Sequence, residues 1–432
     1  MAKPVYGDLV RITAADAVHE GILLKNEETD STVIKLDSGY NIGILPKNIK
    51  KIELIKKGKQ APEARAKPKR HAKAKKKKIS ILHTGGTIAS KVDYKTGAVY
   101  SGFSPGELLD MFPELSDIAD LDSKLISNMW SDDLRFSHLK KIAKAIGEEV
   151  KKGADGIIIG MGTDNLAVAS AALAFIIESS PVPIILVGAQ RSSDRGSSDA
   201  AMNLICAAEF ITKTDFCHVA ICMHKGSDDT VCSILPATKT AKLHTSRRDA
   251  FKPVNDTAIA EVDYRTRQVR FCKKDYMKKG KLKILPDMEE KVGLLKVHIN
   301  MFPEEFLAFK GYKGLVIEGT GLGHTPGQVT DEETKIHKKI YDAIKTLTGS
   351  GCIVVMTSQC LFGRVHMHVY SKGTELSALG VISGEDMLAN TALVKLSWLL
   401  ANHPKEAKDL IGKDMRGEIN RRLQLQNDVS NL

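Results

Sequence analysis

The sequence has no apolar stretch long enough to cross a membrane. Its longest uncharged apolar run is Leu166 to Ile177, whereas a bilayer-spanning helix needs about 20 residues. The opening residues, Met1-Ala-Lys-Pro4, lack the apolar core of a signal peptide. These absences argue against a membrane or secreted protein, and we expect a cytoplasmic one.

Cysteine is scarce, and no metal-binding pattern is present. The seven cysteines are odd in number and contain no C-x-x-C pair, which favours free thiols in a reducing compartment. Several histidines lie near the polar loops discussed below. None is spaced from an acid or a thiol as metal ligands usually are, so we expect no metal site. These histidines are His83, His244, His324, His366 and His368.

The sequence also lacks a nucleotide-binding loop. No G-x-x-x-x-G-K-[ST] run or other kinase signature occurs, so we expect no cofactor in this chain and no ATP chemistry.

Most of the chain lacks net charge, because the formal charge of +11 is concentrated in one segment. Residues 56–78 hold twelve Lys or Arg residues and a single acid, Glu63. The segment has few apolar residues and its charges repel one another, so we interpret it as an extended basic linker. Its lysines and arginines could bind RNA phosphates, although aromatic residues that would stack on bases are absent. A solvated hinge is an equally good interpretation.

Residues 1–55 alternate between polar and apolar positions as β-strands do. Four short runs, separated by polar or Gly-containing turns, predict a small β-barrel of four or five strands. The runs are Asp8–Thr13, Glu20–Leu24, Thr32–Leu36 and Asn41–Ile44. Such a barrel either binds a partner or has a purely structural role.

From residue 79 the pattern changes to strands alternating with helices, which predicts a parallel α/β sheet covered on both faces. A break near residue 289 divides residues 79–288 from a smaller α/β domain at 289–432. A final charged segment, Pro404–Arg422, is predicted to be helical. The predicted strands are 79–83, 156–160, 184–188, 218–223, 292–297, 314–318 and 353–356, and the predicted helices are 137–152, 166–178, 331–348 and 389–401.

Polar loops follow several predicted strands, and in parallel sheets such loops gather at one edge. Thr84-Gly-Gly-Thr87 follows the first strand, where a Gly-Gly turn can expose a side chain. A threonine hydroxyl is a weak nucleophile, so Thr87 would need a base and an oxyanion pocket from other segments.

The candidate partners of Thr87 have other possible interpretations. Thr163 and Asp164 open a predicted helix, where both residue types are also favoured as N-caps. Lys239 and Lys242 lie near hydroxyl groups, and a buried lysine can act as a base, but either lysine could simply be solvated.

Taken together, T-G-G-T-I-A, G-T-D, G-A-Q-R and K-x-x-T-S-x-x-D-A-F resemble the bacterial-type asparaginase/glutaminase family over residues 79–400. The resemblance implies an asparaginase-like pair of α/β domains and a two-step acyl transfer. Thr87 aligns with the family's nucleophile, and Thr163, Asp164 and Lys242 align with its second threonine, acid and lysine. Lys242 is chosen over Lys239 by its interval to Phe251.

The same resemblance implies how a substrate is held. Ser131 and Asp132 match the segment that grips the α-amino and α-carboxyl groups, with a helix N-cap as the alternative. Backbone N–H groups near Gly86 and Gly162 are candidates for the oxyanion pocket. A tyrosine lid is expected, for which Tyr94 is favoured over Tyr100.

Two positions depart from the family pattern: Met161 and Asn165 replace the usual His and Thr beside G-T-D. Met161 removes a polar neighbour and could change the shape of the pocket. Gly319-Thr-Gly-Leu-Gly323 matches a Gly-rich loop that borders a neighbouring protomer's site, which implies a homodimer.

Other motifs resemble, over nearly the whole chain, the glutaminase subunits of archaeal tRNA-dependent amidotransferases. They include G-D-L-V-R-I, K-L-D-S-G-Y-N-I-G, H-T-S-R-R-D-A-F and G-E-D-M-L. This resemblance implies a heterotetramer in which a partner subunit uses ATP and magnesium to activate glutamyl-tRNA(Gln). The alternatives are a free-standing L-asparaginase and a non-catalytic RNA-binding scaffold, and the preference for glutamine or asparagine stays open.

Overall fold

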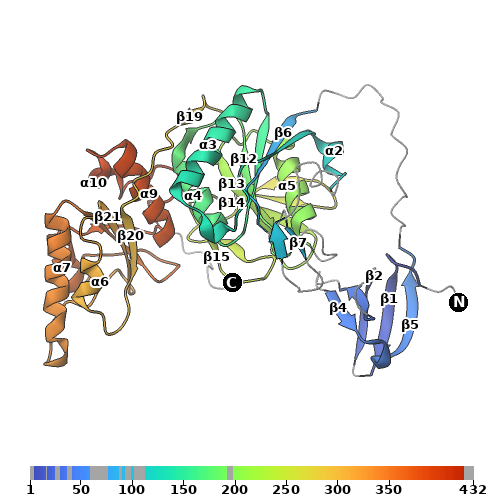
Figure 1. Ribbon diagram of the computed structural model, residues 1–432, viewed down its shortest axis with the longest axis horizontal. Helices are drawn as coiled ribbons and strands as arrows, with labels where there is room; N and C mark the ends of the chain where they lie inside the picture. The colour runs from blue at the N-terminus through green and yellow to red at the C-terminus, as the bar shows by residue number, and fades with distance from the viewer. Residues whose placement is uncertain are drawn as a thin grey trace.

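The computed structural model describes residues 4–15, 17–24, 30–36, 41–58, 76–86, 90–92, 99–101, 112–191 and 198–422. Figure 1 shows three units along the molecule. The N-terminal β-unit lies at one end, a large α/β unit occupies the middle, and a smaller α/β unit lies at the other end.

Residues 1–55, for which a small β-barrel is predicted, contain five strands in their described part, and we call them the N-terminal β-unit. Its described residues form an antiparallel sheet in the order β4-β3-β2-β1-β5, around a small core that includes Val10, Ile12 and Ile34. The described parts of β4 and β5 do not pair with each other, so the sheet is open between them. The elements are β1 (Leu9–Ala14), β2 (Val18–Leu24), β3 (Thr32–Lys35), β4 (Asn41–Ile44), η1 (Pro46–Asn48) and β5 (Ile49–Lys56).

The central unit contains a mixed sheet, not the wholly parallel one that the alternation predicts. Among the described residues its order is β18-β17-β14-β13-β12-β10-β6-β9, with antiparallel pairing from β13 through β18. The parallel strands are β6 (Lys78–His83), β9 (Asp120–Leu125), β10 (Gly156–Gly160), β12 (Ile184–Val187) and β13 (Val219–His224). The antiparallel strands are β14 (Val231–Pro236), β17 (Ala260–Asp263) and β18 (Val269–Phe271).

Helices cover both faces of this sheet, as its apolar strands require. Ile157 and Ile159 of β10 pack into one core cluster and Ile158 packs into another, because successive side chains of a strand point to opposite faces. The helices α3 and α4 belong to the first cluster, and α5 belongs to the second. The helical elements of this unit are α2 (Leu115–Ile118), η3 (Ser131–Asp133), α3 (Phe136–Lys151), α4 (Leu166–Ile176) and α5 (Ala200–Lys213).

The helix predicted over residues 166–178 ends early. Residues 177–179 form a short strand, β11 (Ile177–Ser179), that pairs with β19 (Lys283–Ile284). Pro181 follows closely, and a proline disfavours helical backbone in the residue before it. The other short strand pairs are β7 (Ser90–Val92) with β8 (Val99–Ser101), and β15 (Thr240–Lys242) with β16 (Phe251–Pro253).

The smaller unit repeats the strand–helix pattern. Its described strands form a parallel sheet in the order β20-β21-β22-β23. Helix α4 of the central unit packs on α9, where the rings of Phe175 and Trp398 lie 6.0 Å apart. The elements are β20 (Val292–Lys296), α6 (Pro303–Leu307), β21 (Gly314–Gly319), η4 (Glu333–Ile336), α7 (His337–Gly349), β22 (Ile353–Ser358), α8 (Ser371–Ala378), β23 (Ile382–Ser383) and α9 (Ala389–Asn402).

The helix predicted over Pro404–Arg422 is wrong for most of its length. Only α10 (Ala407–Leu410) is helical there, and Gly417 adopts a positive φ of 77°, which does not occur within a right-handed helix. Apolar residues of the segment pack into the core, and a buried ion pair also holds it: Lys395 Nζ and Glu418 Oε1 lie 2.6 Å apart with both side chains fully buried. Burial lowers the pKa of Lys395 and raises the pKa of Glu418.

This buried pair predicts a large stability effect. Glu418→Gln would leave the ammonium of Lys395 buried without its counter-charge, at a cost of about 3 kcal/mol. We expect the midpoint of thermal unfolding, measured by calorimetry, to fall by about 3 °C. The control is Glu406→Gln, an exposed residue that faces His403 at 3.5 Å and should change stability by less than about 1 kcal/mol. Equal shifts in the two variants would contradict this view of the pair.

Candidate active site

The polar loops lie together at one edge of the central sheet. Gly160 of β10 is in register with His83 of β6 on one side and with Val187 of β12 on the other. These parallel strands therefore end level with one another. Their following segments, 84–86, 161–164 and 188–191, begin at the same edge.

Three of the predicted side chains meet at this edge. Lys242 Nζ donates to Thr163 Oγ1 at 2.9 Å and to Asp164 Oδ1 at 2.7 Å. The side chain of Lys242 is 14% exposed and that of Asp164 is 66% exposed. The hydroxyl is thus joined to an amine that is itself anchored by a carboxylate, an arrangement that can pass a proton.

A β-hairpin brings Lys242 to the sheet edge. Lys242 ends β15, and its register partner in β16 is Phe251, a fully buried residue. Lys239, three residues earlier, points elsewhere: its Nζ lies 2.5 Å from Oδ2 of Asp386, and both side chains are buried. Lys242, and not Lys239, therefore reaches Thr163.

Neither Thr163 nor Asp164 caps a helix. The N-cap of α4 is Asn165, and the side chains of Thr163 and Asp164 are bonded to Lys242. The hydroxyl of Thr163 also donates to Oε1 of Gln190 at 3.3 Å. The N-cap interpretation of the G-T-D motif is therefore wrong for this chain.

The predicted nucleophile Thr87 and the predicted lid residue Tyr94 lie outside the described residues, as does the side chain of Tyr100. Gly86, directly before Thr87, is described and has a φ of 77°. A Cβ atom on Gly86 would lie 2.3 Å from the backbone nitrogen of Gly162. Only glycine fits so close an approach, so the end of the T-G-G segment packs against the segment that carries Thr163.

The segment Trp130–Asp132, which contains the predicted substrate-binding residues, also reaches this edge. The hydroxyl of Ser131 would lie 2.9 Å from a Cβ atom on Gly162, and Ser131 is buried. Ser131 and Asp132 are the first residues of η3, whose N-cap is Trp130, so their interpretation as N-caps is wrong. Asp132 is exposed.

The two departures from the family pattern have different positions. Met161 is buried in the apolar core beneath the sheet edge and does not contribute a polar group there. Asn165 braces the site: its Nδ2 donates to the carbonyl of Ser131 at 2.8 Å, and its backbone N–H donates to Ser131 Oγ at 3.3 Å. Asn165 thereby fixes η3 against the loop after β10.

Gln190 is a site residue that sequence reasoning did not assign. It lies in the G-A-Q-R run, and its backbone N–H is held by Oδ1 and Oδ2 of the buried Asp199, both at 3.0 Å. A Cβ atom on the neighbouring Gly188 would lie 2.8 Å from Cγ2 of Thr163. The G-A-Q-R motif was the one sequence feature that could have indicated Gln190. The contact of Gln190 with Thr163, however, depends on the pairing of β10 with β12.

A cleft of about 390 Å³ opens beside Lys242 between the two α/β units, a size suited to a small ligand. Asp164 and Lys242 line it from the central unit, and Glu318 and Asn390 line it from the smaller unit. In the part of the chain that the structure describes, no three His, Cys, Asp or Glu residues gather as metal ligands would. The helices of this part include none that is both long and apolar enough to span a membrane.

Three family models match the chain, each over one of its units. The "GatD N-terminal domain" matches residues 5–55, "Asparaginase, N-terminal" matches residues 78–276, and "Glutaminase/Asparaginase C-terminal domain" matches residues 291–410. Together they span most of the sequence.

Solved structures and curated proteins agree with these models. The thermostable L-asparaginase from Thermococcus kodakarensis is similar with a TM-score of 0.69 and 27% identity, over 80% of this chain and 100% of that chain. A probable cytoplasmic L-asparaginase from Campylobacter jejuni has a TM-score of 0.63 and 26% identity, over 78% of this chain and 98% of that chain.

Among curated proteins, the D subunit of glutamyl-tRNA(Gln) amidotransferase from Pyrococcus furiosus is 43% identical over 96% of this chain and 94% of its own length. The protein of the same name from Methanococcus maripaludis is 43% identical over 97% of this chain and 99% of its own length. The chain therefore belongs to the family of glutamyl-tRNA(Gln) amidotransferase D subunits, an asparaginase-type enzyme family.

Proposed function

We propose that this chain is the glutaminase subunit of a tRNA-dependent amidotransferase. It releases ammonia from glutamine, and a partner subunit uses that ammonia to convert Glu-tRNA(Gln) to Gln-tRNA(Gln). The observation that carries the proposal is the contact of Lys242 with both Thr163 and Asp164, in a chain 43% identical to a curated D subunit over nearly its whole length.

In the proposed first step, the hydroxyl of Thr87 attacks the side-chain amide carbon of the substrate. The proton of that hydroxyl passes through Thr163 and Lys242 to the leaving nitrogen, and ammonia departs. An ester between Thr87 and the γ-glutamyl group remains. Backbone N–H groups near Gly86 and Gly162 stabilise the oxyanion that forms during the attack.

In the second step, water attacks the ester, the same groups return the proton to Thr87, and glutamate leaves. Asp164 keeps the amine of Lys242 aimed at Thr163 throughout, as their 2.7 Å contact supports. Gln190 accepts a hydrogen bond from the hydroxyl of Thr163 at 3.3 Å and so contacts this hydroxyl beside Lys242.

Residues at the edge of the central sheet hold the substrate. Ser131 and Asp132 bind the α-carboxyl and α-amino groups of the substrate, and Asn165 keeps their segment in place. Tyr94 closes over the bound amide. The chain itself uses no cofactor, and ATP and magnesium act at the partner subunit.

The assembly that we propose is a heterotetramer. It contains a homodimer of this chain and two copies of the amidotransferase's E subunit, which binds the tRNA and activates its glutamyl group. The basic segment 56–78 carries the chain's whole charge excess and suits contact with tRNA phosphates.

A free-standing L-asparaginase is the second candidate, because the similar solved structures are L-asparaginases. The match of residues 5–55 to the GatD N-terminal domain argues against it. A non-catalytic RNA-binding scaffold is disfavoured by the intact contacts among Thr163, Asp164 and Lys242.

The deciding experiment measures ammonia release from glutamine and from asparagine, with and without the E subunit and glutamyl-tRNA(Gln). We expect release from glutamine that increases when both are added. Equal release from asparagine by the chain alone, with no response to tRNA, would favour the asparaginase.

The proton-transfer role of Thr163 predicts a selective loss of kcat. Thr163→Val keeps the shape of the side chain but removes the hydroxyl that Lys242 contacts, so kcat for ammonia release should fall by about 100-fold or more while KM changes little. Steady-state kinetics test this. Thr257→Val, at an exposed threonine of the same unit, is the matched control and should retain full activity. A wild-type kcat in Thr163→Val would remove Thr163 from the mechanism.

The nucleophile role of Thr87 predicts a covalent adduct. Acid quenching during turnover should trap a γ-glutamyl ester, seen by mass spectrometry on the peptide that contains Thr87. Thr87→Ala should yield neither adduct nor ammonia, because the attacking oxygen is gone. Undiminished ammonia release by this variant in the purified complex would show that another residue is the nucleophile.

A further inference from the structure

An ion pair joins the N-terminal β-unit to the central unit. Nζ of Lys35, at the end of β3, lies 2.5 Å from Oδ2 of Asp229, in the turn between β13 and β14. The two side chains are 21% and 28% exposed, so solvent screens the pair only partly. The covalent connection between the units is the basic segment 56–78, whose composition predicts an extended linker. Noncovalent contacts such as this one therefore set where the β-unit sits.

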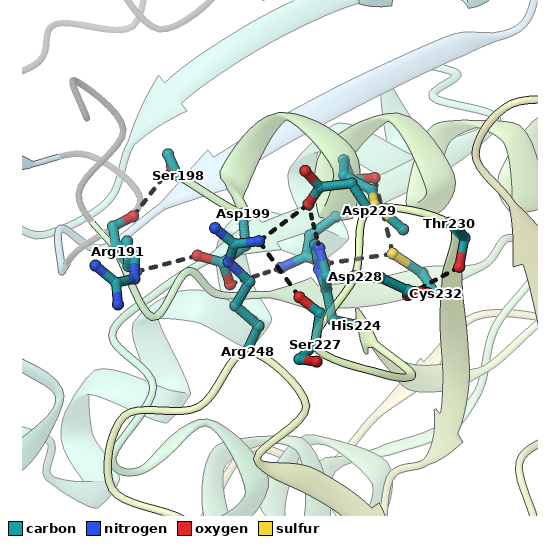
Figure 2. Close-up of polar contacts among 12 residues, drawn as sticks. Arg191, Ser198, Asp199, His224, Ser227, Asp228, Asp229, Thr230, Cys232 and Arg248 are labelled. Atoms are coloured by element: carbon teal, nitrogen blue, oxygen red, sulfur yellow. Dashed lines mark hydrogen bonds and ion pairs between the residues drawn. The ribbon is translucent and has the colours of Figure 1, made fainter. Parts of the chain in front are cut away.

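Asp229 also faces inward, toward two fully buried groups. Its Oδ1 lies 3.2 Å from Nη1 of Arg248 and 3.3 Å from Nε2 of His224, as Figure 2 shows. Burial raises the pKa of Asp229, but the hydrogen bond from His224 and the charges of Lys35 and Arg248 hold it well below its ordinary value. The carboxylate of Asp229 is thus the counter-charge for cationic groups from two units.

The contacts continue from His224 through the protein interior. Nδ1 of His224 lies 2.7 Å from Oδ1 of Asn203. Nδ2 of Asn203 donates to the carbonyl of Gly188 at 3.0 Å and to Oδ2 of Asp199 at 3.3 Å. His224, Asn203 and Asp199 are all fully buried, so each must keep its partners to avoid a costly unpaired polar group.

The last links reach the catalytic groups. Asp199 accepts from the backbone N–H of Gln190 at 3.0 Å, and Gln190 accepts from the hydroxyl of Thr163 at 3.3 Å. We call this continuous series of contacts, from Lys35 to Thr163, the relay.

A second branch leads from Asp229 to the hairpin of Lys242. Arg248 lies in the loop between β15 and β16, and its Nη1 also contacts the carbonyl of Ser227 at 3.4 Å. The same carboxylate therefore contacts both the loop that follows Lys242 and the series that ends at Thr163.

We propose that the relay is a positioning device: docking of the N-terminal β-unit through Lys35 sets the orientation of Thr163 for proton transfer. Asp229 and Gln190 are positioning residues in this device, because they act on the reaction through Thr163. The inference rests on the proposed function of Thr163 in amide hydrolysis. With such a device, the rate of ammonia release responds to any event that moves the N-terminal β-unit.

The physical basis is that a buried, fully paired polar network has few alternative arrangements. Without the ammonium of Lys35, Asp229 is free to shift toward Arg248 and His224, and the change passes to Asn203 and Asp199. The substrate-binding segment around Ser131 is not part of the relay. The expected effect therefore falls on kcat and not on KM.

The test begins at the outer end of the relay, where substitution leaves the folded core intact. In the full-length chain, Lys35→Met should lower kcat for ammonia release by about threefold to tenfold, with KM unchanged within about twofold. Lys35→Arg retains the positive charge and should restore most of the rate. Lys47→Met, at an exposed lysine of the same β-unit, is the matched control and should have wild-type kcat.

A second measurement does not depend on activity. Hydrogen–deuterium exchange followed by mass spectrometry should show faster exchange of the peptide spanning residues 186–191 in Lys35→Met, and wild-type exchange in Lys47→Met. If the wild-type chain releases no ammonia from either amide, the proposed function fails, and exchange alone then tests the structural relay. Unchanged exchange, or altered exchange with unchanged kcat in an active enzyme, overturns the positioning role.

Discussion

The site depends on one long-range contact, the reach of Lys242 across to Thr163 and Asp164. Thr163 is held at the end of a parallel strand, and Lys242 is carried to it by a hairpin from a later part of the chain. The hydroxyl, amine and carboxylate work together only while both supports stay in register, because hydrogen bonds weaken steeply with distance and angle. Close glycine packing provides that register: Gly86 lies against Gly162, and Gly188 lies against Thr163.

Buried charges fix the surroundings of this contact. Lys239 is paired with Asp386 of the smaller unit, so the segment leading to Lys242 is tied across the unit boundary. Lys395 is paired with Glu418 and holds the chain's charged final segment against α9. Such pairs gain little net stability over apolar replacements, but losing one partner is costly, so they favour one arrangement of the units. Asp229 of the central unit likewise forms an ion pair across a unit boundary, with Lys35 of the N-terminal β-unit.

Residues of the same type have different contacts at neighbouring positions, which limits what local sequence can indicate. In local sequence Thr163 and Asp164 suit a helix N-cap as well as a proton-transfer group, and only the folded structure shows that both contact Lys242. Lys239 and Lys242 are both near hydroxyls in sequence, yet one is buried in an ion pair and the other reaches the sheet edge. Met161, whose position beside the G-T-D motif suggested an altered pocket, belongs to the core.

The sequence by itself determined the alternating strands and helices, since apolar periodicity follows from which faces must be buried, and it determined the motifs that carry the family resemblance. It did not determine the antiparallel strands β14, β17 and β18, the strand at Ile177–Ser179 or the mostly non-helical course of Pro404–Arg422. Those features, like the contacts of Gln190, Asn165 and Asp229, depend on partners distant in the chain. The free energy of strand pairing, ion pairing and hydrogen bonding depends on distances that only the folded arrangement sets.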